Sequence, residues 1–99
     1  MFPDYNDDVR SLRGQPRRKI FQPVDMQAAG QAVRAHLLDL SASGALVHST
    51  TPPAPGTPLR LTIGGAVRTA RVVWRDGVRF GIAFALPLDA ADVARVLGG

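Results

Sequence analysis

Two short segments carry side-chain types suited to binding an anionic ligand. The first, RGQPR, places Arg13 and Arg17 four residues apart, and the second, DLSASG, holds Asp39, Ser41 and Gly44. A guanidinium is a planar fork of donors that pairs bidentately with phosphates and with guanine edges. Pro16 and Gly14 disfavour a helix around the arginines. We therefore expect Arg13 and Arg17 to lie on a loop that is free to close around a ligand.

The composition alone does not prove such a role. The 99-residue chain has 12 Lys and Arg against 8 Asp and Glu, and no glutamate. Such an excess, by itself, is more typical of a solvated surface than of a binding site. The RxxxR spacing also recurs at Arg71/Arg75 and at Arg75/Arg79. The placement of each copy on the predicted elements has to decide between these interpretations.

Composition does exclude several classes of protein. Without cysteine the chain has no disulfide framework, thiolate zinc site or thiol nucleophile. With only His36 and His48, a histidine-based metal site is not expected, and no cofactor is predicted. The acidic start lacks the apolar region of a secretory signal, and no apolar run is long enough to span a bilayer. We expect a single cytoplasmic domain.

The chain divides into a tail and one small domain. Residues 1–9 are polar, acidic and without apolar periodicity, which predicts a flexible N-terminal tail. Residues 10–99 are expected to form the domain, with the basic loop at 10–19. The segment LDAADVARVLGG predicts a C-terminal helix over 89–97, with Asp89 as N-cap and Asp92 at the capping-box position.

Between the loop and the helix, the patterns are typical of antiparallel strands. Two extended runs at about 20–28 and 32–40 flank a turn at AAGQ, and Pro23 places the first run at an edge or a bulge. In LRLTI, alternate residues are apolar, and DG at Asp76 and Gly77 predicts a hairpin. We expect an all-β fold of six antiparallel strands, closed into a barrel and accompanied by the helix.

Strand pairing about Gly30 brings the two motifs together. Leu40 is expected opposite about Ile20, which would place Asp39 and Ser41 next to Arg17 and Arg18. In the DG hairpin, Trp74 is expected near Arg79 as a structural cation–π pair, and Val78, Phe80, Ile82 and Phe84 on one face. The basic loop would therefore face the DLSASG turn.

The ordered pair of motifs resembles the RxxxR and (D/N)xSxxG signature of PilZ domains. Pro23 and Val24 in the first strand, and RVVWRDGVRFGIAF before the helix, add to the likeness, which extends over about 11–85. PilZ domains are six-stranded antiparallel barrels that bind the bacterial second messenger cyclic di-GMP. The resemblance implies a receptor that orders its arginine loop on the ligand and signals to a partner protein in motility, exopolysaccharide or biofilm control.

The resemblance also assigns roles to individual residues. Arg13 and Arg17 suit the phosphates and the O6/N7 edge of guanine, Asp39 suits the guanine N–H edge, and Ser41 can hydrogen-bond at the same rim. Gly44 can take a positive φ or allow the close approach of a base or the backbone. The implied cyclic di-GMP-binding residues are Arg13, Arg17, Arg18, Asp39, Ser41 and Gly44, with the contributions of Arg10, Arg18 and Trp74 left open. An apolar Leu12 favours one ligand molecule per chain.

Three other functions are less compatible with the sequence. A hydrolase built from His36, Asp39 and Ser41 is disfavoured, because residues 36 and 39 of a strand point to opposite faces and no nucleophile elbow is present. A small barrel that binds single-stranded nucleic acid suits the charge, but the few aromatics fall mostly on apolar strand faces. A PilZ-like interaction module without ligand typically lacks the arginines or the DxSxxG turn, both of which this chain has.

Overall fold

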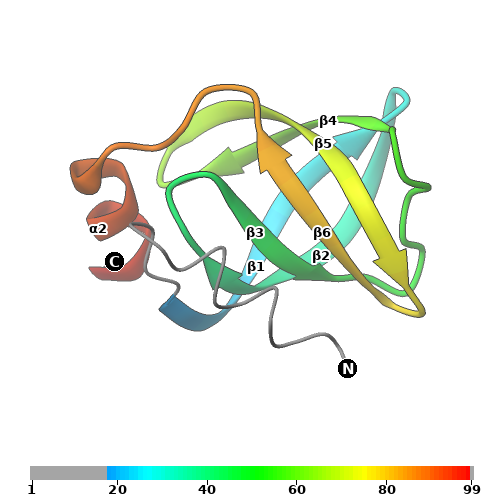
Figure 1. The fold of residues 1–99 in the computed structure, drawn as a ribbon, viewed down its shortest axis with the longest axis horizontal. Coiled ribbons are helices and arrows are strands. Elements are labelled where there is room, and N and C mark those ends of the chain that lie inside the picture. Colours follow the sequence, from blue (N-terminus) through cyan, green and yellow to red (C-terminus); the bar gives the residue numbers. More distant parts are fainter. Residues whose placement is uncertain (1–17, 99) are drawn as a thin grey trace.

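The computed structural model describes residues 18–98 (Figure 1). These residues form six strands and one helix. In chain order the elements are β1 (Arg18–Ala28), β2 (Gln31–Leu40), β3 (Gly44–His48), β4 (Pro58–Ile63), β5 (Ala66–Asp76), β6 (Arg79–Phe84) and α2 (Ala90–Gly98).

The strands form a closed barrel in the order β1-β2-β3-β6-β5-β4, and every neighbouring pair is antiparallel. The predicted six-stranded antiparallel barrel with a short C-terminal helix is therefore confirmed. Closure removes most of the unpaired strand edges that a small open sheet would expose.

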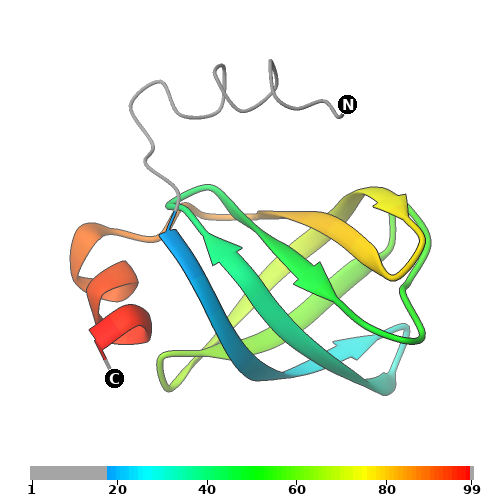
Figure 2. The same ribbon diagram turned by 90° about the horizontal axis from the view of Figure 1, so that it is seen from below.

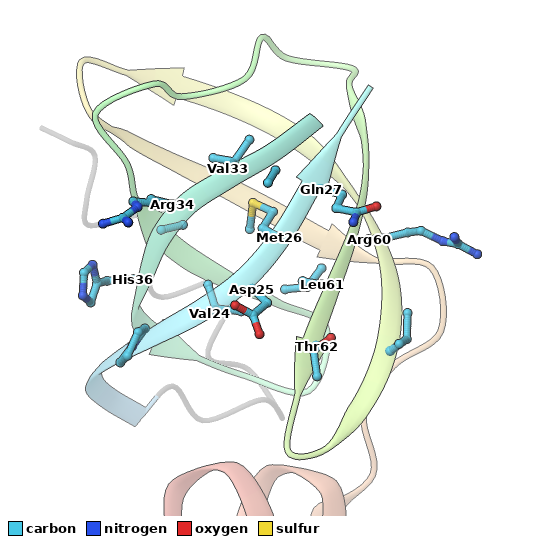
Figure 3. Close-up of a pocket in the computed structure, with 14 residues that line it drawn as sticks. Val24, Asp25, Met26, Gln27, Val33, Arg34, His36, Arg60, Leu61 and Thr62 are labelled. Carbon is cyan, nitrogen blue, oxygen red and sulfur yellow. The ribbon is translucent and has the colours of Figure 1, made fainter. Parts of the chain in front are cut away.

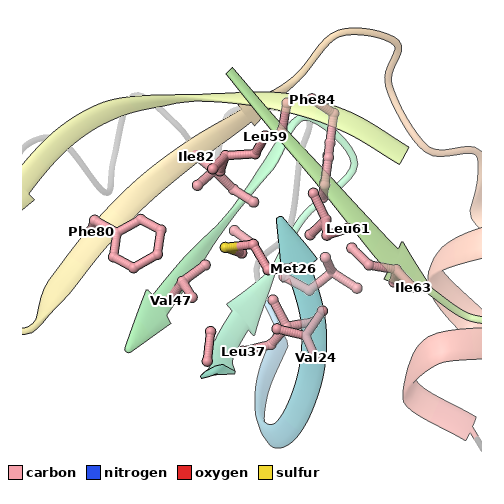
Figure 4. Close-up of a cluster of buried hydrophobic side chains, with 14 of the residues drawn as sticks. Val24, Met26, Leu37, Val47, Leu59, Leu61, Ile63, Phe80, Ile82 and Phe84 are labelled. Carbon is pink, nitrogen blue, oxygen red and sulfur yellow. The ribbon is translucent and has the colours of Figure 1, made fainter. Parts of the chain in front are cut away.

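Alternating apolar residues fill the barrel interior (Figure 4). Leu59, Leu61 and Ile63 of β4 point inward, as the alternation in LRLTI predicts, and only 1–4% of each is exposed. Phe80 of β6 is the largest fully buried side chain. Val78, which the sequence placed on the same face as Phe80, instead lies in the β5–β6 turn and is 44% exposed.

The turn position explains both that error and the wrong partner for Trp74. Asp76 stays in β5 and pairs with Arg79, so Gly77, at φ 62°, and Val78 form the two-residue loop. A turn centred on Asp76 and Gly77 would require both residues to adopt positive φ, and in the hairpin only the glycine does. Trp74 is consequently opposite Gly81 and not Arg79.

An irregularity in β1 adjusts its pairing with β2. The register runs from Ala28 opposite Gln31 to Gln22 opposite Leu37, and resumes with Lys19 opposite Asp39. Two residues of β1 therefore face one residue of β2, as in a β-bulge. Leu40 is opposite Arg18, two residues from the predicted partner at about position 20.

The predicted helix is present and packs at one end of the barrel (Figures 1 and 2). Val96 and Leu88 join the core, and the Gln22 side-chain amide donates to the Val96 carbonyl at 2.8 Å. Asp89 and Asp92 form a reciprocal capping box: the Asp92 N–H donates to Asp89 Oδ1 at 2.8 Å, and the Asp89 N–H donates to Asp92 Oδ2 at 3.3 Å. Within residues 18–98, no helix has the length and apolar character required to cross a membrane.

Candidate functional site

The DLSASG segment forms the end of β2, the β2–β3 turn and the start of β3, and backbone hydrogen bonds hold it. Both the N–H and the Oγ of Ser41 donate to the Gly44 carbonyl, at 2.9 and 3.3 Å. The Phe84 N–H donates to the Ser43 carbonyl, and the Leu88 N–H donates to the Ala42 carbonyl. Because β6 and the segment that leads to α2 both fix the turn, its polar groups keep one arrangement.

Asp39 is held at the base of this turn. The residue is 6% exposed, and its Oδ1 accepts a hydrogen bond from the Leu46 N–H at 3.2 Å. A buried carboxylate is costly unless it is hydrogen-bonded, so the backbone of β3 contributes to holding Asp39 in place. The same bond fixes the direction in which the carboxylate points.

Gly44 allows β3 to approach β6 closely. A Cβ at this position would overlap the carbonyl oxygen of Ile82 in the neighbouring strand. The close backbone approach that the sequence suggested is therefore present. The sequence also suggested a positive φ for Gly44, which was wrong, because Gly44 is not among the glycines with positive φ.

The strand register places Asp39 in a row of side chains across the barrel wall. Trp74 pairs with Gly81, Gly81 with Leu46, Leu46 with Asp39, and Asp39 with Lys19. Residues directly opposite one another in antiparallel strands share a face of the sheet. The row therefore joins exposed Lys19, buried Asp39 and exposed Trp74 on the outer side of the barrel wall, with about 14 Å from Asp39 to Trp74 at the usual strand spacing.

Arg18 is the one implied ligand-binding arginine that lies within residues 18–98. It is exposed, begins β1, and pairs with Leu40 at the same barrel end as the β2–β3 turn (Figure 2). Arg13, Arg17 and Arg10 lie outside residues 18–98, as do Leu12 and the tail at 1–9. Of the implied ligand-binding residues, Arg18, Asp39, Ser41 and Gly44 thus meet at one end of the barrel.

Sequence reasoning missed two members of the row. Lys19 was counted only as part of the basic loop, although it is directly opposite Asp39. Trp74 was assigned to Arg79, because the position of the hairpin turn was predicted incorrectly. The irregular register between Val72 and Trp74 interrupts the alternation of β5 and turns the tryptophan outward, and the sequence carries no local signal of this shift.

His36 does not join the turn. It pairs with Pro23 on β1 and His48 on β3, and its ring stacks on that of Phe21. The structure therefore offers no histidine to activate Ser41, whose hydroxyl donates to a backbone carbonyl. Among residues 18–98, no three His, Cys, Asp or Glu side chains group as metal ligands.

A surface depression lies elsewhere, between β1, β2 and β4 (Figure 3). Asp25, Arg34, His36 and Arg60 are on its rim, but Arg34 and Arg60 point away from each other (Figure 3). A specific pocket has polar groups that converge on a ligand. The β2–β3 turn with its neighbouring row is thus the better candidate site.

One comparison with known proteins identifies the family of the chain. A family model for the PilZ domain matches residues 11–98, which is nearly the whole chain. No curated protein and no solved structure matches the chain significantly.

Proposed function

Since the chain belongs to the PilZ domain family, whose members are cyclic di-GMP receptors, we propose that it binds cyclic di-GMP and signals to a partner protein. The observation that carries the proposal is the pairing of Arg18 with Leu40. Through it, the chain that leads into β1 enters the barrel beside the Asp39–Gly44 turn. Both halves of the family motif then contribute to one site.

Chain connectivity supports a contribution from the two arginines of the motif. Arg17 precedes Arg18 directly, and Arg13 is five residues from it, a reach of at most about 17 Å in an extended chain. We assign Arg13, Arg17 and Arg18 to the phosphates and to the O6/N7 edge of guanine. The two charges of the ligand would also suit Lys19, which is opposite Asp39.

Asp39 has the chemistry for the opposite edge of guanine. A carboxylate accepts hydrogen bonds from the N1–H and the exocyclic amine, which adenine does not present in the same arrangement. One oxygen of Asp39 is already oriented by the Leu46 N–H. Ser41 and Gly44 shape the rim beside it, and their turn is held before any ligand arrives. This prior order reduces the entropic cost of binding.

Because PilZ is a binding domain and not a catalytic family, the protein would signal by changing the surface that it presents to a partner protein. Closing the arginine segment over the outer face of the barrel changes which groups a partner meets. We propose a cytoplasmic receptor whose partner acts in motility, exopolysaccharide synthesis or biofilm formation, the processes typical of the family.

Calorimetric titration with cyclic di-GMP tests the proposal, with GMP and single-stranded DNA as competing ligands. Saturable binding of cyclic di-GMP, with weak binding of the other two, is the expected result. Arg17→Ala and Arg13→Ala should each weaken binding about tenfold or more, since charge-assisted hydrogen bonds contribute roughly 1.5–3 kcal/mol each.

Arg60→Ala is the matched control. Arg60 is an exposed arginine of β4. This strand pairs with β1 and β5 and not with β2 or β3, which flank the turn. Its loss should leave the affinity unchanged. Tight DNA binding without a cyclic di-GMP signal would identify a nucleic-acid-binding barrel instead.

A further inference from the structure

Phe21 is an exposed aromatic residue two positions after Lys19 on β1. It is 71% exposed, although a phenylalanine in a strand of a small barrel usually joins the core. It lies in the irregular stretch of β1 between Lys19 and Gln22, where Ile20 packs against the core and Phe21 faces outward. Bulges commonly redirect a side chain next to a functional site.

The imidazole ring of His36 stacks on one face of the Phe21 ring and holds its orientation. His36 is opposite Pro23, two residues along β1 from Phe21, so the two aromatic residues are diagonal neighbours on the outer face. Their ring centroids are 4.6 Å apart and the planes are inclined by only 9°. One face of Phe21 is therefore covered by the imidazole. With 71% of the residue exposed, the rest of the ring is accessible.

This stacked pair lies beside the polar row. Lys19 is two residues before Phe21 and directly opposite Asp39. Both side chains of β1 are on its outer face, and two residues of a strand span about 7 Å. The oriented ring of Phe21 thus lies near the Asp39 carboxylate, which suits a guanine edge. Arg18 and Lys19 supply cations suited to phosphates.

We propose that Phe21, supported by His36, is a stacking surface for one base of the cyclic dinucleotide. The proposal rests on the proposed function and adds a second mode of base recognition. Asp39 would contact one guanine through its N–H edge, whereas Phe21 would contact a base through its π face. Every nucleobase has such a face, so the platform would add affinity without selecting the base. Because His36 already orients the ring, little side-chain entropy is lost on binding.

The test is titration of cyclic di-GMP into the parent, Phe21→Ala, Phe21→Leu and Phe21→Trp. A stacked base is typically worth enough for a loss of about 5-fold to 100-fold on substitution by alanine. Phe21→Leu keeps most of the apolar area and removes the π face, so it should bind as weakly as Phe21→Ala. Phe21→Trp should bind at least as tightly as the parent.

Val67→Ala provides the matched control for the loss of an exposed apolar side chain. Val67 of β5 is 66% exposed and does not belong to the row. This variant should titrate like the parent. Thermal unfolding of each variant shows whether the barrel is intact, which is expected for substitutions at such exposed positions.

His36→Ala examines the supporting residue. Without the imidazole the phenyl ring is less fixed, so binding should weaken less than in Phe21→Ala. His36→Phe should restore the affinity, since a second phenyl ring can occupy the same stacked position. Equal affinity in all His36 variants would remove this residue from the proposal.

The outcomes separate the two proposals. A parent chain that binds no cyclic di-GMP overturns the receptor function and, with it, the stacking surface. A parent that binds, together with Phe21→Ala and Phe21→Leu variants that bind equally well, overturns the stacking surface alone. A ligand-induced shift of the Phe21 ring protons in NMR spectra, absent on addition of inorganic phosphate, would directly support base stacking.

Discussion

Gly81 is directly opposite Trp74 in the β5–β6 ladder, and the indole occupies the space in which a side chain at Gly81 would begin. The ring thus lies against the backbone of β6, one strand away from Leu46 and two from Asp39. Trp74 is the only tryptophan of the chain. Its fluorescence consequently reports on this part of the outer surface alone.

Gly81→Ala should displace the indole. The added methyl would overlap Nε1 and the neighbouring ring atoms, so the tryptophan has to move outward. We expect a red-shifted emission maximum and a loss of about 1–3 kcal/mol in the free energy of unfolding, typical of overpacked positions. Fluorescence and urea denaturation measure both, and an unchanged spectrum would show that the indole does not rest on Gly81.

Gly44→Ala should cost more stability than a typical surface substitution. The new Cβ would overlap the Ile82 carbonyl oxygen, which belongs to the backbone and cannot rotate away. We expect a loss of about 1–3 kcal/mol or more, measured by thermal or urea unfolding. Gly98→Ala is the control: a Cβ there meets nothing within 4 Å, so stability should be unchanged or slightly higher. Equal stabilities of the two variants would contradict the close β3–β6 approach.

Asp39→Asn separates the charge of this residue from its structural bond. Asparagine retains an oxygen that can accept from the Leu46 N–H, so the fold should persist. Loss of the negative charge should nevertheless weaken cyclic di-GMP binding by about tenfold to a hundredfold. Asp25→Asn, at an exposed position of β1 opposite Arg34, should bind like the parent. Titration calorimetry distinguishes the two, and equal affinities would exclude Asp39 from guanine recognition.

The capping box of α2 gives two stability predictions. Asp89→Ala removes the acceptor of the Asp92 N–H and should cost about 0.5–2 kcal/mol, as for other N-caps. The second concerns pH. The Asp89 backbone N–H, helped by Arg95 and Arg68, holds the pKa of Asp92 below its ordinary value.

A lowered carboxyl pKa stabilises the fold only while the group is ionised. This contribution is complete above the unfolded-state pKa of about 3.9 and is lost as the pH falls through the lower folded-state pKa. Asp92→Asn should therefore be less stable than the parent at pH 7, and the two stabilities should converge only as the pH falls below the folded-state pKa of Asp92. Thermal unfolding across this range measures the difference, and a difference that grows on acidification would refute the assignment.

Local patterns predicted the elements well. Alternation in LRLTI identified the inward positions of β4, and the spacing of Asp89 and Asp92 identified the helix start. Both are properties of a few consecutive residues. The turn expected at DLSASG is likewise local, and hydrogen bonds of Ser41 and Asp39 hold it.

Relations between distant strands were harder to predict. The one-residue irregularities in β1 and β5 change which side chains are opposite each other, and no single residue type announces them. The contact of Gly44 with Ile82 and that of Gly81 with Trp74 depend on pairing after folding. The row from Lys19 to Trp74 could therefore be recognised only from the register of five strands.

The ladder between β1 and β4 covers Asp25–Ala28, whereas β1 begins at Arg18. The first half of β1 instead contacts α2, where the Gln22 side-chain amide donates to the Val96 carbonyl. Pro23, in the same half of β1, has no backbone N–H that could pair with another strand. Loss of the helix would leave the Gln22 amide without the Val96 carbonyl, and the start of β1 would then depend on its pairing with β2 alone.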